Sequence, residues 1–139
     1  MKPVFVAVTM VLGMCVAGCS GDGPAGTRGP DRGLSGEWVG TLYGICDVEP
    51  PDADCSLFLT QVDSLISGRF ESGCGLGAVD ISHGSYRGNI LSMRMDYHFG
   101  NGEFLELVGT VHDSAVAGAY TSGDSMGTAH GSWEARKIR

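Results

Sequence analysis

Among the residues with a reactive side chain, Cys19 is the one whose neighbouring sequence indicates a reaction most clearly. It closes the stretch Val16-Ala17-Gly18-Cys19, after an apolar run that starts at Pro3 and a single positive residue, Lys2. A positive start, an apolar run and small residues before a cleavage point are the layout of an export signal. The run is shorter than the roughly 20 apolar residues that span a bilayer. We therefore expect it to be removed rather than to cross the membrane.

The same residues resemble a bacterial lipoprotein signal. The resemblance implies that residues 1–18 are removed and that Cys19 receives a diacylglycerol on its sulfur and an acyl chain on its new amino group. Three acyl chains would hold the protein firmly, since two already suffice for stable anchoring. The expected partner is then the lipid bilayer of the bacterial cell envelope, and Ser20 favours the outer over the inner membrane. An ordinary secretory signal with an incidental cysteine is the alternative.

Three cysteines remain in the exported body: Cys46, Cys55 and Cys74. An oxidising compartment favours a disulfide and leaves one thiol over. If the strands around Asp63-Ser64 form a hairpin, Cys55 faces position 72, so Cys55–Cys74 is the first choice of pairing. Cys46–Cys55 and Cys46–Cys74 are the alternatives. No histidine lies near these cysteines in sequence, so structural bridging is favoured over catalysis.

Other patterns point to neither a metal nor a cofactor. The acidic loop 47–54 has clustered oxygens, but its spacing matches no calcium-binding loop and it contains two prolines. The four histidines fall on separate strands without metal-ligand spacing. Gly123-Asp124-Ser125-Met126-Gly127 matches the nucleophile elbow of hydrolases, but it bridges two predicted strands instead of joining a strand to a helix. We expect no catalytic residue and no enzyme activity.

The acidic composition argues against nucleic acid as a partner. The chain carries a formal net charge of −7, and removal of residues 1–18 takes away Lys2 and no acid, which leaves −8. A protein that binds phosphates needs clustered Lys and Arg, whereas most of the arginines here are scattered. Net charge also predicts that the body touches an anionic membrane weakly and that attachment depends on the lipid.

The chain divides into a signal over residues 1–18, the lipidated cysteine with a Gly/Pro-rich tether over 19–34, and one domain over 35–139. The tether segment has no aromatic or β-branched aliphatic residue and reads as a flexible linker. A domain of about 105 residues suits a single small core.

Short runs with period-two alternation predict an all-β domain. The expected strands are Glu37–Ile45, Ser56–Val62, Leu65–Glu71, Ala78–Tyr86, Ile90–Phe99, Glu103–His112, Ala115–Thr121 and Gly127–Arg136. Tight turns at Asp63-Ser64, Gly88-Asn89, Gly100-Asn101-Gly102 and Asp113-Ser114 make neighbouring strands antiparallel. Eight such strands form an up-and-down meander, and closure into a small barrel removes the bare sheet edges.

Alternation also predicts which side chains point inward. In the run from Ile90 to Phe99, Leu91, Met93, Met95, Tyr97 and Phe99 share one face. If the barrel leaves internal volume, the side chains that would line a site for an apolar ligand are Phe70, Met93, Met95, Tyr97 and Tyr120.

Ser35-Gly36-Glu37-Trp38 and Gly131-Ser132-Trp133-Glu134-Ala135-Arg136 resemble the first and last strands of calycins, the lipocalin and avidin barrels. In lipocalins a Gly-x-Trp packs at the closed end of the barrel against a late arginine. The resemblance implies that Trp38 and Arg136 form that pair, a cation–π contact of about 0.5–2 kcal/mol. The body as a whole resembles small Gly-rich β-barrel domains of bacterial lipoproteins, a resemblance that implies no activity.

Three functions are compatible with this reading. The first is a non-catalytic envelope module, structural or adhesive, whose filled barrel contacts another envelope protein. The second is a calycin-like carrier of a small apolar ligand. The third is an envelope protease inhibitor, because some of these are eight-stranded barrels with one disulfide.

Overall fold

The structure is a computed structural model that describes residues 33–98 and 102–139, and these residues form strands and no helix. No helix in the described part of the chain is therefore long and apolar enough to cross a membrane. The strands are β1 (Gly36–Leu42), β2 (Ala53–Val62), β3 (Leu65–Ser72), β4 (Gly77–Asp80), β5 (His83–Arg87), β6 (Ile90–Asp96), β7 (Phe104–His112), β8 (Ala115–Asp124) and β9 (Gly127–Lys137).

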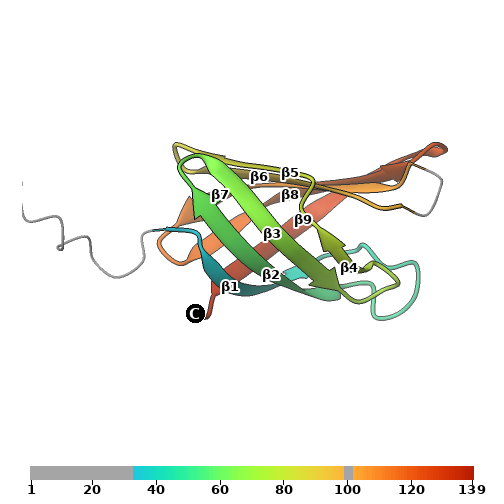
Figure 1. Ribbon diagram of the computed structural model, residues 1–139. Helices are drawn as coiled ribbons and strands as arrows, with labels where there is room; N and C mark the ends of the chain where they lie inside the picture. Colours follow the sequence, from blue (N-terminus) through green and yellow to red (C-terminus); the bar gives the residue numbers. More distant parts are fainter. Residues whose placement is uncertain (1–32, 99–101) are drawn as a thin grey trace, which may run out of the picture.

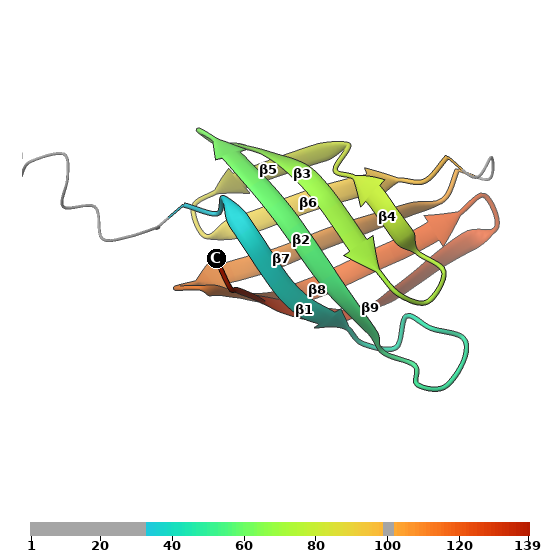
Figure 2. The same ribbon diagram turned by 60° about the horizontal axis from the view of Figure 1, so that its bottom comes forward.

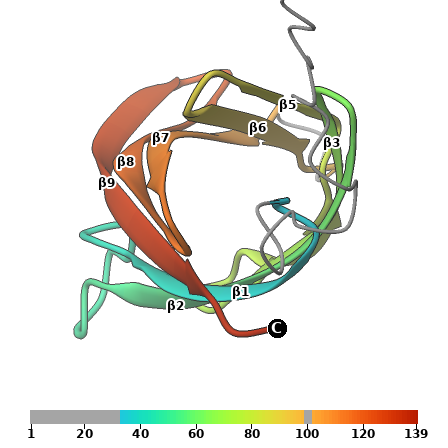
Figure 3. The ribbon, with the colours of Figure 1, turned by 90° about the vertical axis from the view of Figure 1, so that its left-hand side faces the viewer.

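Eight of these strands close into a barrel, as predicted. Each pairs antiparallel with its neighbours in the chain, from β1 and β2 through β3, β5, β6, β7 and β8 to β9, and β9 pairs back onto β1. Seen from the end where β1 begins, the strands form a ring (Figure 3). The sequence interpretation of an all-β, up-and-down meander is confirmed.

The predicted strand Ala78–Tyr86 is two strands. Its break lies at Ile81 and Ser82, where the Ile81 N–H donates to Gly68 O on β3 and the Ser82 N–H donates to Arg94 O on β6, at 2.9 and 2.8 Å. The chain changes its main pairing partner at this point. β4 stays beside β3, outside the closed ring, and β5 runs along β6 (Figure 2).

The two ends of the barrel differ. The tether end contains Leu34, where the chain enters, and the turns at 63–64, 88–89 and 113–114; the disulfide end contains the loop 43–52 and the turn 125–126 (Figure 1). At the tether end Asp63, Gly88 and Asp113 have φ of 55°, 61° and 55°, in the left-handed region that tight hairpin turns require. These three turns are confirmed, whereas part of the fourth, at 100–102, lies outside the described residues.

One continuous cluster of apolar side chains occupies the barrel interior. Leu91, Met93, Met95 and Tyr97 point inward as predicted, and Phe99 lies outside the described residues. Among the described residues no polar or charged side chain other than tyrosine is buried. Burial of apolar surface is therefore the main force that holds the barrel together.

Candidate functional site

The tether end is plugged by the residue at which the chain enters. Leu34 is 2% exposed, and its carbonyl accepts a hydrogen bond of 2.9 Å from Trp38 Nε1. The Leu34 N–H donates to Gln61 Oε1 at 2.8 Å. The segment that the sequence connects to Cys19 is thus fixed to the barrel at one defined place.

The predicted contact between Trp38 and Arg136 is wrong. In the β1–β9 ladder Trp38 lies opposite Lys137, and Arg136 lies opposite Val39. Because side chains alternate along a strand, Arg136 points to the outer face while Trp38 points inward. Lys137 is the cation near the plug, and its Nζ donates to Gly33 O at 3.2 Å. The sequence could have indicated Lys137 instead of Arg136, because Lys137 follows the inward Trp133 and Ala135 at a spacing of two residues.

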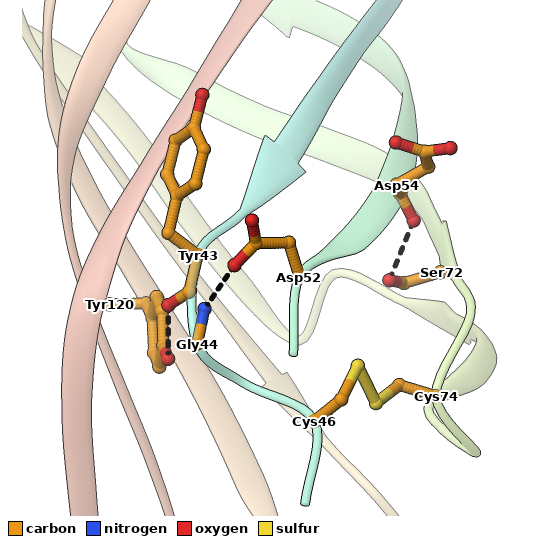
Figure 4. The surroundings of a disulfide bond; sticks show 8 residues. All are labelled: Tyr43, Gly44, Cys46, Asp52, Asp54, Ser72, Cys74 and Tyr120. Atoms are coloured by element: carbon orange, nitrogen blue, oxygen red, sulfur yellow. Dashed lines mark hydrogen bonds between the residues drawn. A yellow bond between two sulfur atoms is a disulfide. The ribbon is translucent and has the colours of Figure 1, made fainter. Parts of the chain in front are cut away.

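The candidate ligand-lining residues lie within the packed interior. Phe70, Met93 and Met95 are fully buried, and all five belong to the same apolar cluster. The Tyr120 hydroxyl donates to Tyr43 O at 2.9 Å, which binds the barrel wall to the loop that follows β1 (Figure 4). Burial, followed by the charge of Glu103, raises the pKa of Tyr97 to about 12. Their role as a ligand lining stays a prediction.

The disulfide joins Cys46 to Cys74, so the first-choice pairing of Cys55 with Cys74 is wrong (Figure 4). The predicted hairpin register is correct, with Cys55 opposite Ser72. However, Cys55 is 4% exposed and points into the barrel, whereas Cys74 lies in the exposed turn after β3. The long loop brings Cys46 to that turn, with a Cα–Cα distance of 5.6 Å.

Short polar contacts fix the loop that carries Cys46. The Gly44 N–H donates to Asp52 Oδ1 at 2.8 Å, and the Cys46 N–H donates to Pro51 O at 2.8 Å. Ser72 Oγ donates to Asp54 O at 2.9 Å, which connects the loop's return to β3 (Figure 4). The acidic side chains of this loop therefore include one with a structural role, Asp52.

Cys55 is a free thiol with little nucleophilic character. Burial, followed by the charge of Asp54, raises its pKa to about 11. The thiolate is the reactive form of cysteine, and this environment disfavours it.

Two open hollows mark the surface. One, of about 680 Å³, crosses the outer faces of β2, β1, β9 and β8, and its lining includes Thr41, Ser56 and Glu134. The other, of about 580 Å³, lies at the disulfide end, where Ile45 and Tyr97 form part of its lining. Of the five candidate ligand-lining residues, Tyr97 alone lines either hollow.

An exposed charge cluster lies beside Phe104, which lines the second hollow. Arg94 lies over the Phe104 ring at 4.3 Å, and its Nε donates to Asp96 Oδ1 at 2.8 Å. Its Nη1 is 3.7 Å from Glu106 Oε2. The hydrogen bond from Arg94 is the main cause that lowers the pKa of Asp96.

A metal site is not assembled in the part of the chain that the structure describes. That part contains no group of three or more His, Cys, Asp or Glu side chains that could hold a metal ion. Ser125, in the elbow-like motif, lies in the β8–β9 turn. There Asp124 Oδ1 accepts the N–H groups of Met126 and Gly127 at 2.7 and 3.2 Å, so the motif's carboxylate builds the turn.

Cys19 lies outside the described residues. Comparison of the chain with protein-family models, with curated proteins and with solved structures finds no match.

Proposed function

We propose that this protein is a lipid-anchored protein of the bacterial cell envelope whose barrel is a non-catalytic structural or protein-interaction module. The proposal that the barrel is a non-catalytic module rests on the burial of the side chains inside it. Phe70, Met93 and Met95 have no exposed surface and belong to one continuous apolar cluster. A filled barrel leaves the outer faces and loops as the places where a partner is bound.

The proposal for the anchor comes from the sequence around Cys19. An apolar run that ends in Val16-Ala17-Gly18-Cys19 supports cleavage before Cys19 and acylation of its thiol and amino groups. Ser20 supports delivery to an outer membrane where the organism has one.

The positions of the two ends support an outward-facing interaction surface. The chain from Cys19 enters at Leu34, and the loop 43–52 lies at the opposite end of the barrel. A disulfide and the Asp52 hydrogen bond hold that loop in one shape. Preorganised loops bind partners with a smaller entropy loss, so the disulfide end is the better candidate for partner binding.

Labelling with radioactive palmitate in a bacterial host tests the anchor. The full chain is expected to incorporate label and to fractionate with membranes. Cys19→Ser should abolish incorporation, whereas the matched variant Cys15→Ser, which removes a cysteine inside the apolar run, should keep it. Equal labelling of both variants would overturn the assignment of Cys19.

Native mass spectrometry of the protein purified from its own envelope distinguishes the interaction-module hypothesis from the hypothesis of a small-ligand carrier. A mass that contains only the polypeptide, its acyl chains and one disulfide supports the filled module. An additional small molecule that survives mild release, and is lost on denaturation, would instead support the carrier.

A further inference from the structure

Charge is distributed unevenly along the barrel axis. Among the described carboxylates, Glu37, Asp63 and Asp113 are those at the tether end, and Glu37 is paired with Arg139. The other described carboxylates lie toward the disulfide end, except Glu134, which is opposite Thr41 near the end of β1 and opposite Ala117 near the start of β8. The negative charge of the body is therefore concentrated at the end farther from the chain's entry point.

Basic side chains show the opposite distribution. Four basic residues lie at the tether end: Arg87 ends β5, Arg136 and Lys137 are the last two residues of β9, and Arg139 follows them. Of the two arginines toward the other end, Arg69 pairs with Glu71 and Arg94 with Asp96. The tether end is thus close to neutral or weakly basic, although the whole chain has a net charge of −7.

The tether end also exposes apolar side chains. Val62 and Leu65, which flank the β2–β3 turn, are 63% and 66% exposed, and Ile90, after the β5–β6 turn, is 46% exposed. The Tyr86 N–H donates to Ser64 O at 2.8 Å, which joins β5 to the β2–β3 turn. These side chains therefore belong to one rim.

Exposed apolar residues lie beside carboxylates at both ends. At the disulfide end Val48 lies between Asp47 and Glu49, and Met126 follows Asp124 by two residues; at the tether end Asp63 directly follows Val62. The tether end differs in its basic side chains, which offset its carboxylates and are attracted to an anionic interface. The two ends differ in charge rather than in apolar content.

We propose that the tether end of the barrel rests on the lipid surface. Val62, Leu65 and Ile90 enter the interface, and Arg87 and Lys137 face the lipid phosphates. The inference rests on the proposed anchoring, because residues 20–33 alone separate Leu34 from Cys19 and keep this end near the bilayer. The net charge of the whole chain predicts weak contact between the body and the membrane. The distribution of that charge favours contact through the tether end and directs the acidic disulfide end away from the bilayer.

Photolabelling tests this orientation on the full lipidated protein. It is reconstituted into phosphatidylcholine vesicles with some phosphatidylglycerol and a phospholipid that carries a photoactivatable group near its headgroup. Labelled peptides are then mapped by mass spectrometry. The turns 62–65 and 87–90 are expected to take up several-fold more label than the turn 124–127.

Paired variants sharpen the test. Leu65→Ser combined with Ile90→Ser removes apolar surface from the tether end and should reduce labelling of both turns severalfold. The variant should still float with the vesicles in a density gradient, because the lipid anchor is intact. Met126→Ser, at a side chain that is 92% exposed at the other end, should change nothing. Flotation with even labelling of both ends would overturn the orientation and leave the anchor intact, whereas loss of flotation would overturn the anchoring and this inference together.

Discussion

At the scale of single residues, side-chain parity decides what the cysteines of this barrel can do. Cys55 is opposite Ser72, close in sequence to Cys74, but it has the inward parity of Leu57 and Leu59. Cys74 has φ of 64° in an exposed turn. A disulfide between them would have to leave the interior, whereas the loop carries Cys46 to Cys74 from outside.

We expect Cys55 to be protected from alkylation in the folded, non-reduced protein, since its thiol is buried and its pKa is raised to about 11. Iodoacetamide at neutral pH should leave it unmodified, and unfolding without reductant should expose it as the one reactive thiol of the mature body. Cys55→Ala should keep the mass deficit of the disulfide, and Cys46→Ala should lose it. The reverse result would restore the Cys55–Cys74 pairing.

Asp96 provides a residue-scale prediction about pH. The Arg94 hydrogen bond holds its pKa below the ordinary value of 3.8, so the folded state binds this proton less readily than the unfolded state. The contribution to stability is complete above that value and is lost as the pH falls through the folded-state pKa. Arg94→Gln should raise the pKa of Asp96 in an NMR titration. Arg69→Gln, which removes a similar exposed pair, should leave it unchanged; a shift in both variants would point to general charge rather than to this contact.

At the scale of elements, alternation and turn chemistry made most of the barrel predictable. The inward set of β6 and the β2–β3 register follow from period two and from the turn at Asp63-Ser64. The break at Ile81-Ser82 was missed, because neither residue is a glycine or proline that marks an irregularity. The β1–β9 register was also beyond local patterns, since it depends on barrel closure between strands far apart in sequence.

Gly68 tests how the coiled strands depend on glycine. Its φ is 140°, and an added Cβ would collide with Phe58 O on β2. Gly68→Ala should therefore lower the free energy of unfolding by more than about 2 kcal/mol. At Gly127, in the β8–β9 turn, a Cβ would meet nothing within 4 Å, so Gly127→Ala should stay within about 0.5 kcal/mol of the natural protein. If urea unfolding gives equal losses of stability for the two variants, the backbone around Gly68 can shift enough to accept a Cβ.

The disulfide should stabilise the barrel without being needed to form it. Cys46 and Cys74 lie outside the buried cluster, and their sequence separation of 28 gives a loop-closure contribution of about 3–4 kcal/mol. The double variant Cys46→Ala, Cys74→Ala should keep the β-sheet circular dichroism spectrum and lose about that much stability. Reductant should have the same effect on the natural protein and none on the variant. Loss of the spectrum on reduction would contradict an independent barrel core.

At the scale of the whole molecule, the closed ring and its packed interior determine what kind of function is open to the body. β1 and β9 close the ring, Leu34 plugs the tether end, and Tyr97 of the core lines the hollow at the disulfide end. The carrier hypothesis needs space among Phe70, Met93 and Met95, which have no exposed surface. Truncation of one of these side chains distinguishes a filled barrel from one that already has space for a ligand.

Phe70→Ala should create apolar space inside the barrel. We expect a loss of about 3–5 kcal/mol in the free energy of unfolding, together with new binding of a naphthylamine probe that fluoresces in apolar surroundings. Phe58 lies on the outer face of the neighbouring strand and is 40% exposed, so Phe58→Ala should lose much less stability and bind no probe. If the natural protein binds the probe as tightly as Phe70→Ala does, the interior already has accessible space. The barrel interior, and not its outer faces, would then be the better candidate for the binding site.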